Sequence, residues 1–343
     1  MRLFKLSLLL VFVTIFSCSK KGTTATRKWL IPEGQVRDGG PGKDGIPSVD
    51  NPQFIAVGEV DFLQDDDLVE GVVYKGKQRA YPHAILDWHE IVNDDFDDIS
   101  YALTYCPLTG TGIAWDRVVD GQLTTFGVSG KLYNNNLMPY DRRTDSYWSQ
   151  LKLLCVNGTL IGTEAATFPT IETTWKTWKK MYPNSEVLSK NTGYSRNYGV
   201  YPYGGYKTDN DYLLFPNSIN DDRLPSKERV LGVLNKGANR VYSLNLFATP
   251  KVIFDTLGDD ELIVIGSQAD NFIVAFRKGD LDGFTLDLSQ LPVLGMDNAG
   301  NALTIDGRIV EGPLSGTRLE QPISFMGYWF AFGTFYAGIG IYE

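Results

Sequence analysis

The chain has 343 residues, a length that suits two ordinary domains better than one. Its composition, 43% hydrophobic and 13% aromatic with 35 glycines, is typical of a folded, turn-rich, strand-rich protein and argues against an all-helical or disordered chain. The formal net charge is −9, and because phosphate binding needs clustered Lys and Arg, we do not expect nucleic-acid binding.

The N-terminus has the pattern of an export signal. Arg2 and Lys5 flank the start of an apolar run over residues 6–16, which predicts a signal peptide over residues 1–17. The run is shorter than the roughly 20 residues that a membrane span needs. Cys18 follows at the position where bacterial lipoproteins are cut and acylated, so we expect a lipid anchor at Cys18 on the periplasmic face of a bacterial membrane. Ordinary secretory cleavage beside a stray cysteine is the alternative. Removal of Arg2 and Lys5 gives a mature charge of −9 − 2 = −11.

The remainder of the chain contains an internal similarity. Residues 18–50 are rich in Gly, Thr, Lys and Pro and predict a tethered entry segment. Residues 69–81 then align without a gap on residues 230–242, at an offset of 230 − 69 = 161, with seven of thirteen positions identical. Further on, Gly158 and Trp175 match Gly312 and Trp329 at an offset of 312 − 158 = 154. The first copy therefore carries 161 − 154 = 7 additional residues.

This similarity predicts two tandem copies of a β-hairpin-rich unit with short capping helices, a mainly β (α+β) fold. We place copy one at residues 51–190 and copy two at residues 226–343, joined by a Tyr-rich segment over residues 191–225. That segment either folds over a cleft and stacks on a sugar or other flat ligand, or is a packed linker.

Local patterns predict the elements of each copy. Hairpin turns are expected at Lys75-Gly76, at Lys236-Gly237 and at Asp120-Gly121. A strand is expected from Ile99 to Tyr105. Short helices are expected over residues 81–92, 175–182 and 329–336, the last two from their aromatic spacing.

Reactive side chains are concentrated in copy one. At the 161-residue offset, the positions of His83, His89 and Cys106 align with Leu244, Pro250 and Ser267 of copy two. We therefore expect any site in copy one, with copy two as a scaffold or a second wall.

The helix expected over residues 81–92 has two faces. Ile85, Trp88, His89 and Val92 share the face expected to be buried, whereas His83, Asp87 and Glu90 share another. Residues six apart are turned by about 240°, so both histidines cannot bind one metal while the helix is regular. His89 is the preferred site residue because the core holds it rigidly. A hydrogen-bonded core histidine is the alternative.

Cys106 ends a strand and enters a Gly-rich turn, where working groups are often placed. Cys106 and His89, with Glu90 or Asp116 nearby, predict a soft ligand set for copper(I) or zinc. Only two of these ligands are convincing, fewer than a closed structural zinc site uses. The alternative for Cys106 is a structural disulfide with Cys155.

Several motifs in fixed order resemble one bacterial family, the domain of unknown function 3179. They are residues 39–47, 80–82, 88–94, 105–108, 125–134, 140–142, 148–150 and 174–175. The resemblance covers nearly all of the mature chain and implies a class without an activity. The family's usual Cys-Pro-Leu-Cys stands here as Cys106-Pro107-Leu108-Thr109, so a dithiol couple cannot operate at this turn. Further polar candidates in the motif and repeat segments are Lys43, Asp44, Arg79, Ser129, Asp141 and Arg142.

Three functions are consistent with these patterns. The first is an envelope lipoprotein that binds a small ligand or a metal ion in a cleft of copy one. The second is a non-catalytic module that binds a glycan or an envelope protein. The third is an enzyme with Cys106 as nucleophile and His89 as its base.

Overall fold

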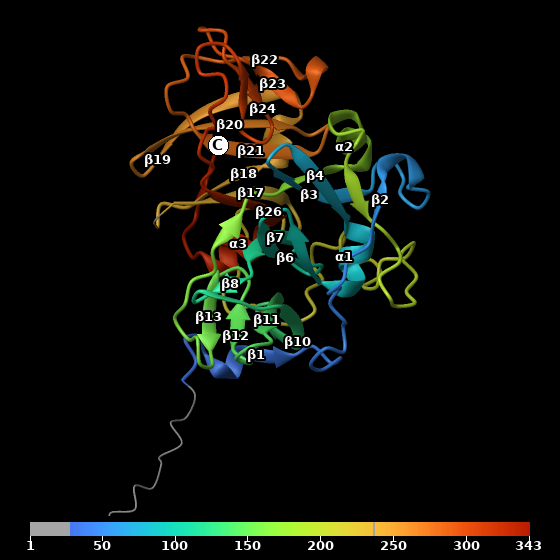
Figure 1. The fold of residues 1–343 in the computed structure, drawn as a ribbon. Coiled ribbons are helices and arrows are strands. Elements are labelled where there is room, and N and C mark those ends of the chain that lie inside the picture. The colour runs from blue at the N-terminus through green and yellow to red at the C-terminus, as the bar shows by residue number, and fades with distance from the viewer. Residues whose placement is uncertain (1–27, 236) are drawn as a thin grey trace, which may run out of the picture.

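The computed structural model describes residues 28–235 and 237–343 (Figure 1). The expected signal peptide and Cys18 lie outside these residues. The described chain is mainly β, with several sheets and three short helices, as the sequence predicts. No helix in the described ranges is long and apolar enough to cross a membrane.

The first sheet is built around the predicted hairpin at Lys75-Gly76. Both turn residues have positive φ, 46° and 80°, as a tight two-residue hairpin requires. The strand order is β15-β3-β4-β16-β2, and only the β16–β4 pair is parallel. The strands are β2 (Phe54–Ala56), β3 (Leu68–Tyr74), β4 (Lys77–Pro82), β15 (Ile171–Thr174) and β16 (Glu186–Leu188).

Two larger sheets and one two-stranded sheet complete the described first half of the chain. One has the order β14-β7-β6-β5, with β5 (Ile91–Phe96), β6 (Ile99–Cys106), β7 (Thr111–Asp116) and β14 (Thr167–Phe168). The other has the order β1-β10-β11-β12-β13, with β1 (Val36–Asp38), β10 (Phe126–Tyr133), β11 (Asn136–Asp141), β12 (Tyr147–Ser149) and β13 (Leu154–Asn157). The predicted Asp120-Gly121 turn joins β8 (Val118–Val119) to β9 (Gln122–Leu123).

The second half has three sheets. The first has the order β26-β17-β18-β27, with β17 (Arg229–Leu234), β18 (Arg240–Ser243), β26 (Ile323–Tyr328) and β27 (Gly340–Ile341). The second has the order β19-β20-β21, with β19 (Lys251–Leu257), β20 (Asp260–Ser267) and β21 (Phe272–Arg277). The third has the order β22-β23-β24-β25, with β22 (Thr285–Leu286), β23 (Val293–Met296), β24 (Ala302–Thr304) and β25 (Ile309–Glu311).

The helices are short. They are α1 (His83–His89), α2 (Trp175–Met181) and α3 (Trp329–Phe335), with 3-10 turns η1 (Glu33–Gln35), η2 (Val57–Glu59), η3 (Leu244–Phe247) and η4 (Leu288–Gln290). The aromatic segments thus form the two predicted helices. The first predicted helix was extended too far, because Glu90 adopts a left-handed conformation with φ 57° and Ile91 begins β5. The β-branched Ile91 and Val92 favour the strand, which pairs with β6.

The two halves follow one order of strand pairing. β15-β3-β4-β16 corresponds to β26-β17-β18-β27, and in both sets the last of these pairs, β4–β16 and β18–β27, is parallel. Helix α2 follows β15 as α3 follows β26. The duplication itself, and the domain boundaries drawn from it, stay predictions.

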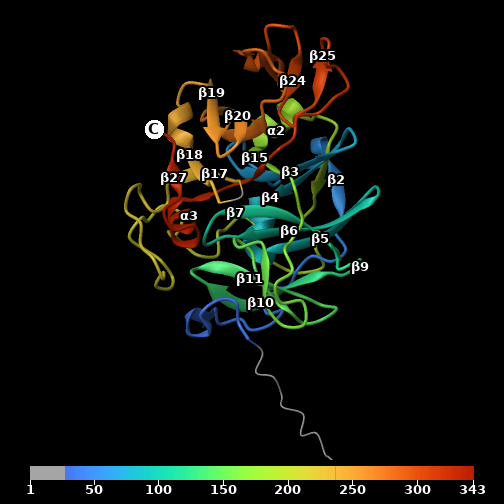
Figure 2. The same ribbon diagram turned by 90° about the vertical axis from the view of Figure 1, so that its left-hand side faces the viewer.

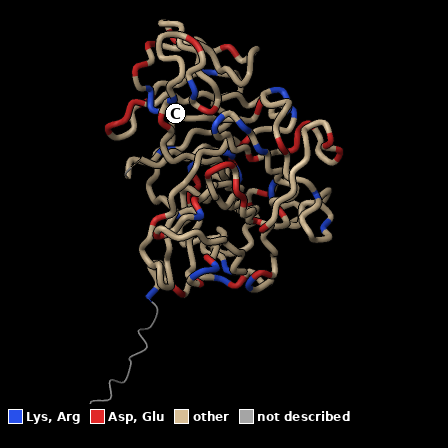
Figure 3. Tube along the Cα trace, viewed as in Figure 1, with Lys and Arg blue, Asp and Glu red and all other residues tan. Residues whose placement is uncertain are grey.

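The two halves share their cores. One hydrophobic cluster joins Trp115 and Trp148 of the first half to Trp329 and Phe332 of the second, and another joins Trp178 to β20 and β21. Figure 2 shows β3, β4, β6, β7 and β17 in the middle of the molecule, with β10 and β11 on one side and β24 and β25 on the other. Acidic and basic residues are interspersed along the trace (Figure 3).

Candidate functional site

His89 lies at the end of α1 with both ring nitrogens in use. Its Nδ1 lies 2.7 Å from the carbonyl oxygen of Pro47, and its Nε2 lies 2.7 Å from the hydroxyl of Tyr198. Burial lowers the pKa of the imidazole. These are the contacts of a histidine that joins α1 to the entry segment and the Tyr-rich segment.

Cys106 ends β6 in the core, 1% exposed. Its thiol lies 3.5 Å from the carbonyl oxygen of Asn135 and accepts from the backbone N–H of Leu137. Cys106 and Cys155 are both free thiols, so the alternative disulfide does not form. Burial raises the pKa of Cys106 to about 11, which keeps the thiol protonated near neutral pH. The predicted pairing of Cys106 with His89 stays a prediction that these contacts do not support.

The other face of α1 carries three ionisable side chains in buried positions. His83, Asp87 and Glu90 are all buried. Asp87 accepts from Lys207 Nζ at 2.9 Å through one oxygen, whereas its other oxygen has no hydrogen-bond partner in the described chain. Burial raises the pKa of Asp87 to about 6 and that of Glu90 to about 8. This face was recognised from the sequence but not chosen as the site.

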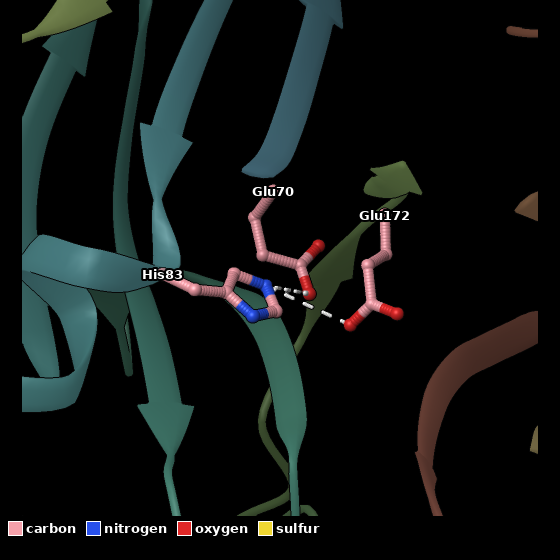
Figure 4. Close-up of side chains that lie close together, drawn as sticks. All are labelled: Glu70, His83 and Glu172. Atoms are coloured by element: carbon pink, nitrogen blue, oxygen red, sulfur yellow. Dashed lines mark ion pairs between the residues drawn. The ribbon is translucent and has the colours of Figure 1, made fainter. Parts of the chain in front are cut away.

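His83 points between two buried glutamates (Figure 4). Glu70 of β3 and Glu172 of β15 are directly opposite in the antiparallel register, and each side chain is 1% exposed. His83 Nε2 lies 3.7 Å from Glu70 Oε1 and 3.6 Å from Glu172 Oε2. Both distances are too long for hydrogen bonds. His83 Nε2 and Glu70 Oε2 have no hydrogen-bond partner among the described residues.

One of the two carboxylates of this cluster has a positively charged partner, Arg229. Arg229 of β17 donates through Nη2 to the Glu172 carboxylate and, at 2.7 Å through Nη1, to the carbonyl oxygen of Gly110. Burial and then the neighbouring Glu172 raise the pKa of Glu70. Burial, then Lys207 and Arg229, lower the pKa of His83. The lowered pKa favours the neutral imidazole, whose Nε2 can offer a lone pair when Nδ1 carries the proton.

The ligand atoms of Glu70, His83 and Glu172 all lie within 4.8 Å of one another. Two donors that are each about 2.1 Å from one ion lie about 3.4 Å apart at a tetrahedral angle and about 3.6 Å apart at 120°. The two distances from His83 Nε2 fit this spacing. On the opposite side of the ring, Tyr105 OH lies 3.3 Å from His83 Nδ1, where the hydroxyl can fix the tautomer.

The fold does not require polar residues at these positions. In the second half Leu231 of β17 lies opposite Met326 of β26, just as Glu70 lies opposite Glu172. Leu244 begins η3 directly after β18, just as His83 begins α1 directly after β4. Leu231, Leu244 and Met326 pack together in one buried apolar cluster. The same strand arrangement thus accommodates an apolar trio, which indicates that the polar trio serves a function.

The Tyr-rich segment packs over α1. Trp88 Nε1 donates to the carbonyl oxygen of Val200 at 3.0 Å, and Tyr203 OH lies 3.5 Å from Glu90 Oε1. A cavity of about 470 Å³ remains between this segment, α1 and the entry segment, lined in part by Asp87, Trp88 and Tyr203. The segment therefore packs against α1 and borders a cavity, and stacking on a flat ligand there stays a prediction.

One protein family covers nearly all of the elements described above. The family model described as protein of unknown function (DUF3179) matches residues 43–338 of the chain. The chain belongs to this family. No curated protein and no solved structure matches it.

Several motif residues within the DUF3179 region contact one another. Arg142 donates to Asp44, Ser48 and Asp50 and so fastens the entry segment to the sheet of β10 and β11. Lys43 forms an ion pair with Asp145. These contacts have the character of structural clamps.

The other polar candidates have local partners as well. Arg79 pairs with Asp94 and Glu186. Ser129 donates to the carbonyl oxygen of Met138, and Asp141 accepts from Thr144. Asp116 accepts from the backbone N–H of Val118.

Glu70 and Glu172 were not among the residues predicted from the sequence. The sequence of this DUF3179 chain did contain a signal for Glu70, because an acid interrupts the otherwise apolar segment from Val69 to Val73. In the repeat alignment the same position is Leu231. Glu172 carried a similar signal, because the 154-residue offset aligns it with Met326 (172 + 154 = 326), but its nearness to Glu70 and His83 follows only from the strand register.

Proposed function

We propose that this protein binds a divalent transition-metal ion between Glu70, His83 and Glu172, as an exported, lipid-anchored protein of the bacterial envelope. One observation carries the metal proposal. A fully buried histidine aims its unpartnered Nε2 between two buried carboxylates at distances that fit a shared ion better than a hydrogen bond. A buried polar atom without a partner is costly, and a bound ion would remove that cost for His83 Nε2.

The donor set indicates the kind of ion. One imidazole and two carboxylates suit Zn²⁺, Mn²⁺ or Fe²⁺, whereas copper(I) prefers thiolates. The buried thiol of Cys106 is engaged with backbone groups away from this trio. We therefore favour Zn²⁺, Mn²⁺ or Fe²⁺ over copper(I), the alternative that the sequence suggested.

The test uses the chain from residue 19 onward, purified without chelators and then reloaded with Zn²⁺. Metal content by elemental analysis and Zn²⁺ titration by calorimetry should give one equivalent per chain. His83→Ala should abolish binding. His89→Ala is the matched control, because it removes the other histidine of the same helix and should leave the stoichiometry unchanged.

Either of two results would overturn the metal proposal. One is wild-type protein that binds no Zn²⁺, Mn²⁺ or Fe²⁺ in titration. The other is loss of binding in His89→Ala with binding retained in His83→Ala. Circular dichroism of both variants distinguishes loss of the site from loss of the fold.

The envelope location is supported by the sequence pattern around Cys18, where a short apolar run precedes the cysteine. Full-length protein should fractionate with membranes and carry a labelled fatty acid. Cys18→Ser should release it from the membrane fraction or leave its precursor uncut. A Cys18→Ser protein that is processed and membrane-bound like the wild type would refute the lipid anchor.

A further inference from the structure

A small cavity is lined by Gly112, which contacts the carboxylate of Glu70. It has a volume of about 150 Å³, which leaves room for several water molecules. Its walls come from β7, from the residues before β15 and from the start of β26, and they include Gly112, Thr170 and Ser324. Residues from both halves of the chain therefore enclose it.

Gly112 connects this cavity to the cluster. A Cβ atom at Gly112 would overlap Glu70 Oε1, which is the oxygen that faces His83 Nε2. The absence of a side chain at this position leaves room for the carboxylate. An ion bound to Oε1 would thus lie near the strand that forms one wall of the cavity. Thr170 is two residues before Glu172, so the second carboxylate also belongs to a segment that borders the cavity.

Three protein ligands leave a coordination position open. Within the described ranges, Glu70, His83 and Glu172 are the one group of three or more His, Cys, Asp or Glu side chains with metal-ligand spacing, and it has no fourth member. Metal sites with three protein ligands usually complete their coordination with water or with a substrate. None of the three ligands lines the cavity, but Gly112 lies between it and Glu70 Oε1, so we take the cavity as the space that such a molecule would occupy.

The charge of the loaded site indicates which molecule fits. A divalent ion and Arg229 bring three positive charges, and the two glutamates bring two negative charges, while His83 is neutral. One positive charge remains in a buried site, where an uncompensated charge is unfavourable. A small monovalent anion would neutralise it. No Asp, Glu, Lys or Arg lines the cavity itself to oppose an anion.

We infer that the metal ion held by Glu70, His83 and Glu172 keeps a coordination position open toward the Gly112–Thr170–Ser324 cavity and binds a small monovalent anion there in exchange for water. This inference rests on the proposed metal site and adds its ligand class. The cavity volume restricts the anion to a few non-hydrogen atoms.

The test uses Co²⁺ as the metal and azide as the anion. The chain from residue 19 onward, loaded with one equivalent of Co²⁺, should change its visible absorption spectrum on titration with azide and saturate at one azide per ion. Ser324→Trp places a large ring in the cavity, so it should retain Co²⁺ binding and weaken azide binding by at least about tenfold. Ser315→Trp, at an exposed site away from the cavity, is the matched control.

The outcomes separate the two proposals. Co²⁺ that binds stoichiometrically but does not respond to azide would overturn the open position and leave the metal site standing. An azide response that is equal in Ser324→Trp and wild type would overturn the cavity as the place of binding. Absence of Co²⁺ and Zn²⁺ binding in folded wild-type protein would overturn both proposals.

Discussion

Glu70 and Glu172 lie directly opposite each other on adjacent antiparallel strands, and both side chains are buried. Like charges in this arrangement destabilise a sheet, and Arg229 pairs with only one of the two carboxylates. A divalent ion would supply the missing positive charge. Under the proposed metal site, the opposed pair would therefore link the stability of the sheet to metal binding.

Glu70→Gln tests this link. The amide keeps the shape of the side chain and cannot carry the negative charge that burial and Glu172 disfavour at this position, so metal-free protein should be at least as stable as the wild type. Zn²⁺ at one hundred times its dissociation constant should raise the free energy of unfolding of the wild type by about 2.7 kcal/mol. The same concentration should stabilise Glu70→Gln much less. Urea unfolding with Zn²⁺ and with a chelator measures both quantities, and equal stabilisation of the two proteins would contradict a role for Glu70 as a ligand.

Gly71→Ala should strongly destabilise the protein. The Cα of Gly71 lies against the ring of Trp178, and a Cβ atom would overlap that ring. Overpacking of this kind costs about 1–3 kcal/mol, and more where the neighbour cannot move, as for the fully buried Trp178. Gly232→Ala should have a similar effect, because Gly232 meets Phe332 in the same way.

The control for both glycine variants is Gly58→Ala. A Cβ at Gly58 meets nothing within 4 Å in the described structure, so the free energy of unfolding should be unchanged or raised by up to about 1 kcal/mol. Thermal unfolding of the three variants provides the comparison. Loss of stability in Gly58→Ala comparable to that in Gly71→Ala would show that backbone effects dominate over the aromatic contact.

Much of the fold could be predicted because its signals are local. The Lys75-Gly76 turn and the aromatic helices that begin at Trp175 and Trp329 each follow from residues close together in sequence. The end of α1 could not be predicted, because the helical spacing continues to Val92 while pairing with β6 draws Ile91 and Val92 into a strand. Tertiary pairing overrode the periodic pattern there.

The candidate site was predicted only in part, for a related reason. Copy one and the face formed by His83, Asp87 and Glu90 were recognised, but Glu172 lies 172 − 83 = 89 residues after His83 and meets it only through the β3–β15 register. Arg229 comes from the second half altogether. The pairing of strands this far apart in the chain cannot be inferred from one sequence.

Glu90 should give the protein a measurable pH dependence. Burial raises its pKa to about 8 from the ordinary 4.5, so between these values the native state binds more protons than the unfolded state. This contribution to stability is complete below pH 4.5 and is lost as the pH rises through about 8. Glu90→Gln should remove this decline, a difference of the order of a few kcal/mol across the window.

The measurement is urea unfolding at a series of pH values in the presence of a chelator. Glu311→Gln is the control, since Glu311 is an exposed glutamate of β25 and should leave the curve parallel to that of the wild type. A Glu90→Gln curve that is also parallel to the wild type would mean that Glu90 is ionised in the native protein.

The two core thiols should be unreactive in the native state. Cys106 is 1% exposed and Cys155 is fully buried, and burial raises their pKa values to about 11 and about 12. Because the thiolate is the reactive form, a chromogenic disulfide reagent at neutral pH should modify neither residue in folded protein that begins at residue 19. After unfolding it should detect two thiols, and one in Cys106→Ala. Rapid reaction of one native thiol that disappears in Cys106→Ala would instead revive the cysteine-dependent enzyme, since a nucleophile must be accessible and ionised to act.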